Sequence, residues 1–152
     1  MITLIIWIEN TDKMKNVFLD TNIILDFLGE RAGFYEPAAR ILTLADLKKI
    51  KIYTSAVSIA NTYYLLAKYE NHESAIEKIR KFNVLCTIAT TDDEVLNKAI
   101  NSNFKDFEDS TQYFSAIASG CNLIITRNEK NFKHALIPVM NPIGFLQSFK
   151  NS

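Results

Sequence analysis

The chain has 152 residues, enough for a single domain with a sizeable hydrophobic core, so its fold needs no disulfides or structural metal. Its 17 basic and 17 acidic residues balance, which excludes a global positive field for nucleic acid or an anionic membrane; any such binding must use a local patch. Two cysteines in a chain of this size do not suggest a disulfide framework, and we expect both to be buried free thiols in a reducing cytoplasm.

Residues 1–14 are expected to be an N-terminal extension, with Met14 as a second start and residues 15–150 as the single domain. The extension contains the apolar run Ile2 to Ile8, but no basic residue precedes that run. It is also far shorter than the roughly 20 apolar residues of a membrane-spanning helix. We therefore expect neither a signal peptide nor a membrane anchor.

The domain begins with an apolar strand over residues 17–19 that stops at Asp20, and a helix follows to Leu28, capped by Thr21 or Asn22. Strands and helices alternate from there on, and each strand is short and almost wholly apolar. This pattern predicts an α/β fold, a three-layer α/β/α sandwich with a mostly parallel sheet of about four or five strands. After a turn over residues 29–33, helices are expected over residues 34–49, 55–70, 72–82, 91–101, about 109–119 and 143–149, and strands over residues 51–54, 84–88, 123–126 and 137–140.

Polar residues follow the strands at their carboxyl ends or open the next helices, and in a parallel sheet these positions converge on one edge. The set is rich in oxygen and contains no His or Cys. Carboxylate and amide oxygens suit Mg²⁺ or Mn²⁺, which bind through one or two carboxylates and keep several waters. The residues concerned are Asp20, Asn22, Ser55, Asp109, Thr126 and Asn128, joined by Asn61 two turns into the helix that Ser55 opens.

Three stretches carry a resemblance to a known family: NVFLDTNIILDFL, then YTSAVSIANTYYLL, then KDFEDSTQYFSAIASGCNLIITRNEKNF. In this order and spacing they resemble a PIN domain of the VapC type, from Lys15 to about Phe149. The resemblance implies an α/β/α fold and a metal-dependent ribonuclease that often serves as the toxin of a toxin–antitoxin pair. It also implies an antitoxin protein as partner and a homodimer.

Carried over residue by residue, Asp20 matches the first acid of the family's cluster and Asp109 the later acid at the head of a long helix. The resemblance makes these two the metal ligands, with Glu108 or Asp106 as a further carboxylate. Amides stand where the family usually has three other acids, at Asn61, Asn128 and Asn131.

An amide oxygen can ligate a divalent ion, but it brings no charge and cannot accept a proton from water. The remaining acids suit one weak Mg²⁺ site better than two. Two hypotheses follow: an Mg²⁺-dependent endoribonuclease that uses Asp20, Asp109, Glu108, Asn61 and Asn128, or an inactive PIN fold that binds RNA or a protein partner. A phosphatase-like or nucleotide-binding domain is disfavoured, because no Gly-rich loop follows any strand.

Simpler interpretations stay open at each position. Asp20 and Ser55 can be helix caps, and Asp109 can complement a helix dipole. Tyr63, Tyr64 and Tyr113 are expected in the core, with stacking of a tyrosine on a base as the alternative. Cations such as Arg31 can be ordinary surface residues. If the edge of the sheet binds RNA, the expected contacts are Asn22, Ser55, Thr126, Arg127 and Lys130.

Overall fold

The structure is a computed structural model that describes residues 14–150; apart from Met14, the expected N-terminal extension lies outside the described residues. Five strands form one sheet in the order β3-β2-β1-β4-β5, and every neighbouring pair is parallel. The strands are β1 (Lys15–Leu19), β2 (Ile50–Thr54), β3 (Cys86–Ile88), β4 (Leu123–Ile125) and β5 (Val139–Met140).

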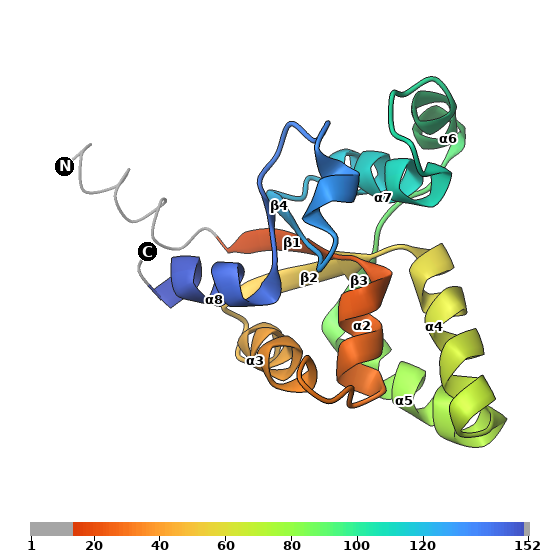
Figure 1. Cartoon of the computed structure of the whole chain (residues 1–152), viewed down its shortest axis with the longest axis vertical. Helices are drawn as coiled ribbons and strands as arrows, with labels where there is room; N and C mark the ends of the chain where they lie inside the picture. Colours follow the sequence, from red (N-terminus) through yellow and green to blue (C-terminus); the bar gives the residue numbers. More distant parts are fainter. Residues whose placement is uncertain (1–13, 151–152) are drawn as a thin grey trace.

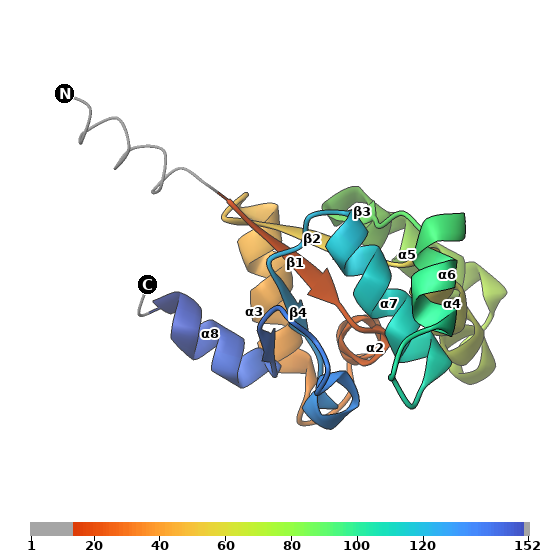
Figure 2. The same ribbon diagram turned by 90° about the horizontal axis from the view of Figure 1, so that it is seen from above.

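Helices cover both faces of this sheet (Figure 1; Figure 2). One layer contains α2 (Thr21–Leu28), α3 (Tyr35–Asp46), α4 (Ala56–Tyr69), α5 (His72–Leu85) and α8 (Pro142–Lys150). The opposite layer contains α6 (Asp93–Ile100), α7 (Phe107–Ala118) and the 3₁₀ turn η1 (Glu129–Phe132). The predicted three-layer α/β/α sandwich with a parallel sheet is therefore confirmed.

The central strand β1 explains the apolar run before Asp20. Side chains alternate between the two faces of a strand. Val17 and Leu19 pack into the core beneath α2, α3, α5 and α8, whereas Phe18 packs into the core beneath α7 and η1. All three side chains are fully buried, because β1 lies between β2 and β4 with helices on both faces.

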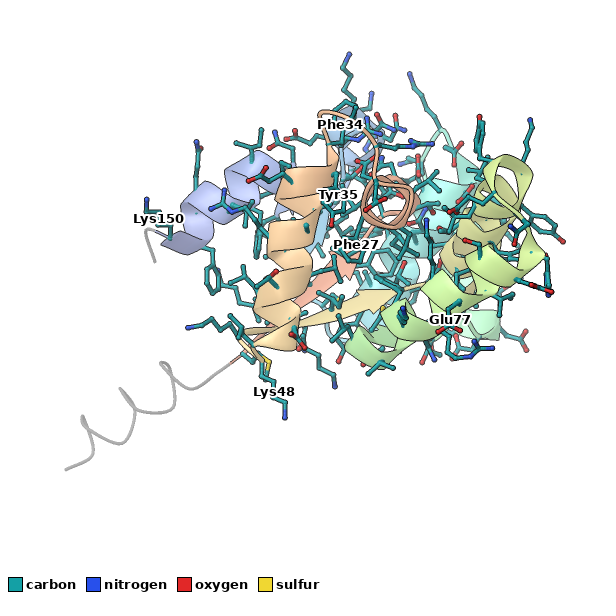
Figure 3. The ribbon with its side chains drawn as sticks, turned by 90° about the horizontal axis from the view of Figure 1, so that it is seen from below. Phe27, Phe34, Tyr35, Lys48, Glu77 and Lys150 are labelled. Atoms are coloured by element: carbon teal, nitrogen blue, oxygen red, sulfur yellow. The ribbon has the colours of Figure 1, made fainter. Side chains whose placement is uncertain are left out.

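In the turn between α2 and α3, Gly29 lies close to the backbone of the last turn of α2. A Cβ at Gly29 would lie 2.8 Å from the carbonyl oxygen of Leu25, so any other residue would force the backbone to shift. Across the turn, Phe27 and Tyr35 stack with ring centroids 5.9 Å apart (Figure 3). The turn is thereby fixed, and it presents Arg31 beside the carboxyl edge of the sheet.

Helix α5 is longer than expected, and it shortens the strand that follows. The strand predicted over residues 84–88 begins at Cys86, because α5 continues to Leu85. Phe82 and Leu85 recur at helical spacing against the core, while Val84 is 83% exposed. The apolar triplet 84–86 therefore spans the end of α5 and only the first residue of β3.

At α2 the alternative cap is confirmed, and at α6 the cap differs from expectation. Asp20 itself caps α2, because its side chain accepts from the backbone N–H of Thr21. At α6 the cap is Asp92, which accepts from Val95 N at 3.0 Å. Thr91 lies one residue too early, and its hydroxyl bonds that of Ser115 instead.

The cysteines are both free, as predicted, although only Cys121 is fully buried and Cys86 is partly exposed. Burial raises the pKa of both thiols to about 12, so neither is a reactive thiolate at neutral pH. Within residues 14–150, no helix has the length and apolar character that crossing a bilayer requires.

Candidate active site

Asp20 lies where β1 ends, next to the end of β4. Because the chain leaves β1 and β4 toward opposite edges of the sheet, this junction is the position at which parallel α/β sheets open a crevice. The Asp20 backbone N–H donates to the Ile125 carbonyl at 3.0 Å. Its side chain accepts from Thr21 N at 2.7 Å and from the Thr126 hydroxyl at 2.8 Å. The carboxylate is therefore held in one orientation by the residues that follow both strands.

Asp109 reaches the same crevice from the first turn of α7. That helix begins at Phe107, two residues earlier than expected, and its cap is Asp106, which accepts from Asp109 N at 2.9 Å. The Asp109 side chain is 8% exposed. Burial, and after it the negative charges of Asp20, Asp106 and Glu108, raise its pKa to about 7, against a smaller lowering by the Asn131 amide.

The two buried acids face one open cleft of about 610 Å³. Asp20 and Asp109 come from segments almost ninety residues apart, yet the charge of Asp20 raises the pKa of Asp109. Every acid and amide that the sequence named for this site lines the same cleft. Its lining residues are Asp20, Thr21, Asn22, Leu25, Arg31, Asn61, Tyr64, Leu65, Asp106, Glu108, Asp109, Gln112, Asn128 and Asn131.

Two amide side chains of the cleft donate hydrogen bonds to its acids. Asn61 Nδ2 donates to Glu108 Oε1 at 3.1 Å, which joins α4 to α7 across the opening. Asn22 Nδ2 lies 3.4 Å from Asp20 Oδ2, and its side-chain oxygen accepts from Arg127 N, also at 3.4 Å. These two amides therefore act as donors to the carboxylates and add no negative charge.

Four of the five expected RNA contacts lie outside the lining of the cleft. Ser55 caps α4 by accepting from Ser58 N, and Thr126 is fully buried, where it holds Asp20. Lys130 is an exposed residue of η1. Only Asn22 of the expected set lines the cleft.

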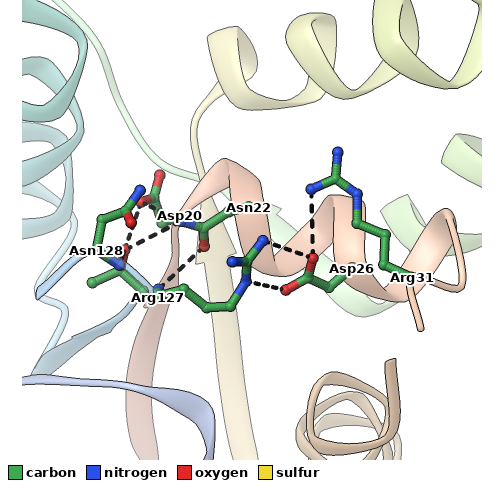
Figure 4. A network of polar contacts seen from close by, with 7 residues as sticks. Asp20, Asn22, Asp26, Arg31, Arg127 and Asn128 are labelled. Carbon is green, nitrogen blue, oxygen red and sulfur yellow. Dashed lines mark hydrogen bonds and ion pairs between the residues drawn. The ribbon is translucent and has the colours of Figure 1, made fainter. Parts of the chain in front are cut away.

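Arg127, the fourth, is bound to Asp26 of α2. Its Nε and Nη2 donate to the two carboxylate oxygens of Asp26 at 2.6 and 3.1 Å, and its guanidinium lies 4.0 Å from the centre of the Phe34 ring. Arg31 approaches the same carboxylate from the other side, at 3.7 Å (Figure 4). The Asp26 side chain is 1% exposed and that of Arg127 27%, so a buried carboxylate links α2 to the segment after β4 through a partly exposed guanidinium.

Neither Asp26 nor Gln112 is predicted in this region from the sequence, and Tyr64 is expected in the core. Asp26 had a signal, since it is the one acid of the helix TNIILDFL and is surrounded by apolar residues. Gln112 lies one turn after Asp109 and therefore on the same face of α7. The expectation of a core position for Tyr64 is wrong: the residue is 70% exposed and lines the cleft, although its spacing on α4 is also that of a core residue.

The donor set of the cleft fits one hydrated divalent ion. Its atoms are hard oxygens, and two buried carboxylates converge where repulsion between acids already raises the pKa of Asp109. Within residues 14–150, no group of three or more His, Cys, Asp or Glu side chains is arranged to hold a metal ion. Mg²⁺ is suited to such a pair, because it binds through one or two carboxylates and retains several waters.

Comparison with known proteins agrees with this architecture. The model of the PIN domain family matches residues 16–130. Ribonuclease VapC1 of Aquifex aeolicus (strain VF5) is 31% identical over 138 residues, which cover 88% of this chain and 94% of that protein. The chain therefore belongs to the PIN domain family, within its VapC-type toxin ribonuclease group.

Solved structures share the fold at lower identity. A toxin–antitoxin complex from Klebsiella pneumoniae contains a chain with a TM-score of 0.64 and 19% identity, covering 83% of this chain and 97% of that one. VapBC-1 from nontypeable Haemophilus influenzae has a TM-score of 0.62 and 15% identity, covering 84% and 98% of the two chains. At this identity the likeness concerns the fold alone.

Proposed function

We propose that this protein is an Mg²⁺-dependent endoribonuclease and the toxin of a toxin–antitoxin pair. The observation that carries the proposal is the pair of buried carboxylates, Asp20 and Asp109, that share one cleft and interact through their charges. Membership of the VapC-type group and the similarity to a ribonuclease named VapC1 support the same conclusion.

In this proposal Asp20 and Asp109 hold the ion. A divalent ion held there supplies positive charge beside the scissile phosphate and lowers the pKa of the attacking water. Thr126 and the backbone of Thr21 keep the Asp20 carboxylate turned into the cleft, as their hydrogen bonds of 2.8 and 2.7 Å indicate. Preorganisation of this kind lowers the reorganisation needed during the reaction.

The other lining residues have roles toward the RNA strand. Glu108 and Asn61, joined at 3.1 Å, stand at the rim and orient water, with Asn128 across the opening. Among the residues that line the cleft, Arg31 is the only cation, and its partner Asp26 holds it beside the acids. Arg31 is thus the candidate to bind an RNA phosphate, and the exposed ring of Tyr64 offers a surface for a base.

The purified protein, incubated with single-stranded RNA and Mg²⁺ or Mn²⁺, tests this function. We expect cleavage by the wild type and at least a 100-fold slower reaction for Asp20→Asn. Losing about 3 kcal/mol of electrostatic stabilisation of the transition state slows a reaction by roughly that factor. Asp93→Asn is the matched control, since Asp93 is an exposed acid in the first turn of α6. Equal rates for wild type and Asp20→Asn would contradict the proposal.

A specific observation favours a second candidate, an inactive PIN fold that binds RNA or a protein. Asn61, Asn128 and Asn131 line the cleft, and none of them can supply charge or accept a proton. This candidate predicts no cleavage by the wild type, together with cleavage by the double variant Asn61→Glu with Asn128→Asp. Cleavage by the wild type excludes it.

The partner proposed for this chain is an antitoxin protein, by its membership of the VapC-type group. The fold is shared with the Klebsiella pneumoniae and Haemophilus influenzae proteins, which were solved as toxin–antitoxin and VapBC structures. Co-expression with the product of a small adjacent gene, followed by purification on a tag carried by this chain, tests the partnership. Recovery of the chain without that product would count against it.

A further inference from the structure

Gln112 has a buried amide side chain that has no role in the proposed metal site. It lies on α7 three residues after Asp109, so both side chains project from the same face of the helix. The residue is only 2% exposed, yet it belongs to the lining of the acidic cleft. A buried polar group in this position is expected to be fully hydrogen-bonded.

A network of hydroxyls fixes one end of that amide. The hydroxyls of Thr21 and Ser55 both donate to Ser58 Oγ, at 2.8 and 2.9 Å. Ser58 therefore uses its own proton elsewhere, and it donates to Gln112 Oε1 at 3.4 Å. The amide oxygen is thus turned toward Ser58 and away from the cleft.

The amide nitrogen is left facing the acids. Within residues 14–150, every fully buried side-chain nitrogen or oxygen has a hydrogen-bond partner. Gln112 Nε2 has none there, since the hydrogen bond of Gln112 is made by Oε1. Nε2 must therefore reach the surface of the cleft. A nitrogen in this position is also favoured over an oxygen by the negative charges of Asp20, Asp109 and Glu108, which surround the same opening.

We propose that Gln112 is a substrate-binding residue whose Nε2–H donates to a non-bridging oxygen of the RNA phosphate at the metal site. The inference rests on the proposed function, because it assigns the ligand of that same cleft. A phosphate repelled by two buried carboxylates needs a donor on the wall, and a neutral amide provides one. Unlike a lysine or an arginine, it does not form an ion pair with Asp20 or Asp109, so the carboxylates remain available for the metal.

Three variants test this assignment. Gln112→Met removes the donor at similar size, Gln112→Glu replaces it with an acceptor, and Ser58→Ala keeps the amide but removes the hydroxyl that orients it. Gln147→Met is the matched control, because Gln147 is the only other glutamine of the sequence and lies exposed on α8. Circular dichroism first establishes which variants are folded.

The probe is a fluorescein-labelled single-stranded RNA, bound in Ca²⁺ in place of Mg²⁺ so that the site holds a divalent ion whose looser coordination does not support the Mg²⁺ reaction. Mn²⁺ binding is measured separately by electron paramagnetic resonance. A hydrogen bond to a charged group corresponds to roughly a 10- to 100-fold change in affinity. We expect Gln112→Met to weaken RNA binding about 10-fold and Gln112→Glu about 100-fold. Ser58→Ala should weaken it by more than about twofold but less than Gln112→Met, because it keeps the donor and loses only the contact that orients it. Mn²⁺ affinity should stay within about twofold for Gln112→Met, and Gln147→Met should match the wild type.

Two results would overturn the assignment. RNA affinity within twofold of the wild type in Gln112→Met, or in Ser58→Ala if that variant alone folds, means that the amide does not bind the phosphate. Tighter Mn²⁺ binding by Gln112→Glu with RNA affinity unchanged means that the side chain is a metal ligand instead. Because RNA binding is measured without cleavage, the two proposals fail separately: weaker binding by Gln112→Met supports Gln112 even if the wild type proves unable to cleave RNA.

Discussion

Replacing Asp109 with asparagine should stabilise the metal-free protein at alkaline pH, which is the reverse of the usual effect of a buried substitution. The ordinary pKa of an aspartate is 3.8, and burial together with the charges of Asp20, Asp106 and Glu108 raises the pKa of Asp109 to about 7. The folded state thus holds a proton that the unfolded state has already released. Asparagine is neutral at every pH and avoids the cost of burying the charge.

The sign and size follow from proton linkage. Below pH 3.8 the carboxyl is protonated in both states, so it contributes nothing. Between pH 3.8 and about 7 only the folded state keeps the proton, and the free energy of unfolding falls by about 1.4 kcal/mol per pH unit. Above pH 7 the penalty is complete, at an upper bound of about 4 kcal/mol that solvent in the open cleft lowers by screening.

Urea unfolding in EDTA at pH 4.5 and pH 8 measures this effect. We expect Asp109→Asn to raise the free energy of unfolding by about 2–4 kcal/mol at pH 8, roughly 4–16 °C in Tm, and by less than about 1 kcal/mol at pH 4.5. The control Asp93→Asn changes an exposed acid in the first turn of another helix and should show no such difference between the two pH values. Equal or lower stability of Asp109→Asn at pH 8 would refute the picture of mutually repelling buried acids.

Further predictions concern the residues around the acids. Asp26→Asn should lower the free energy of unfolding by about 2–4 kcal/mol in urea denaturation, because it breaks the bidentate ion pair with Arg127 and leaves that charge without its partner. Thr126→Val should slow RNA cleavage about 10-fold or more by removing the donor to Asp20, with activity retained in Thr126→Ser; equal rates for the two variants would contradict this role. Arg31→Gln should weaken RNA binding and reduce its salt dependence by about 0.7 in the slope of log K against log [salt], as expected for the loss of one phosphate contact. An unchanged slope would show that Arg31 does not bind phosphate.

The sequence by itself determined the layered architecture, because that depends on local periodicity. A strand buried on both faces must be apolar at every position, and Val17, Phe18 and Leu19 meet that condition. The same logic placed Asp20 at the end of a strand and near the start of a helix. Since parallel strands end at a common edge, the convergence of Asp20 and Asp109 also followed from the order of the elements.

The local sequence pattern did not predict the boundaries of elements where a helix end and a strand fit the same apolar residues. The apolar residues 84–86 fit a strand as well as a helix end, and only packing of Leu85 against the core settles the choice. Helix caps were misplaced by a residue or two for a similar reason, because Asp20 and Thr21, or Thr91 and Asp92, are equally competent caps in sequence. The fold selects the one whose backbone is extended where the helix begins.

Only the tertiary structure decided which polar side chains face the cleft. Arg127 is adjacent to Asn128 in sequence, yet its guanidinium binds Asp26 of α2, a contact across about a hundred residues. Gln112 is an ordinary helical residue in sequence and becomes a candidate ligand only because the hydroxyl of Ser58, itself fixed by two other hydroxyls, meets its amide oxygen. Side-chain direction depends on which partners the fold brings within hydrogen-bonding distance, and such partners lie too far apart along the chain for any local pattern to reveal them.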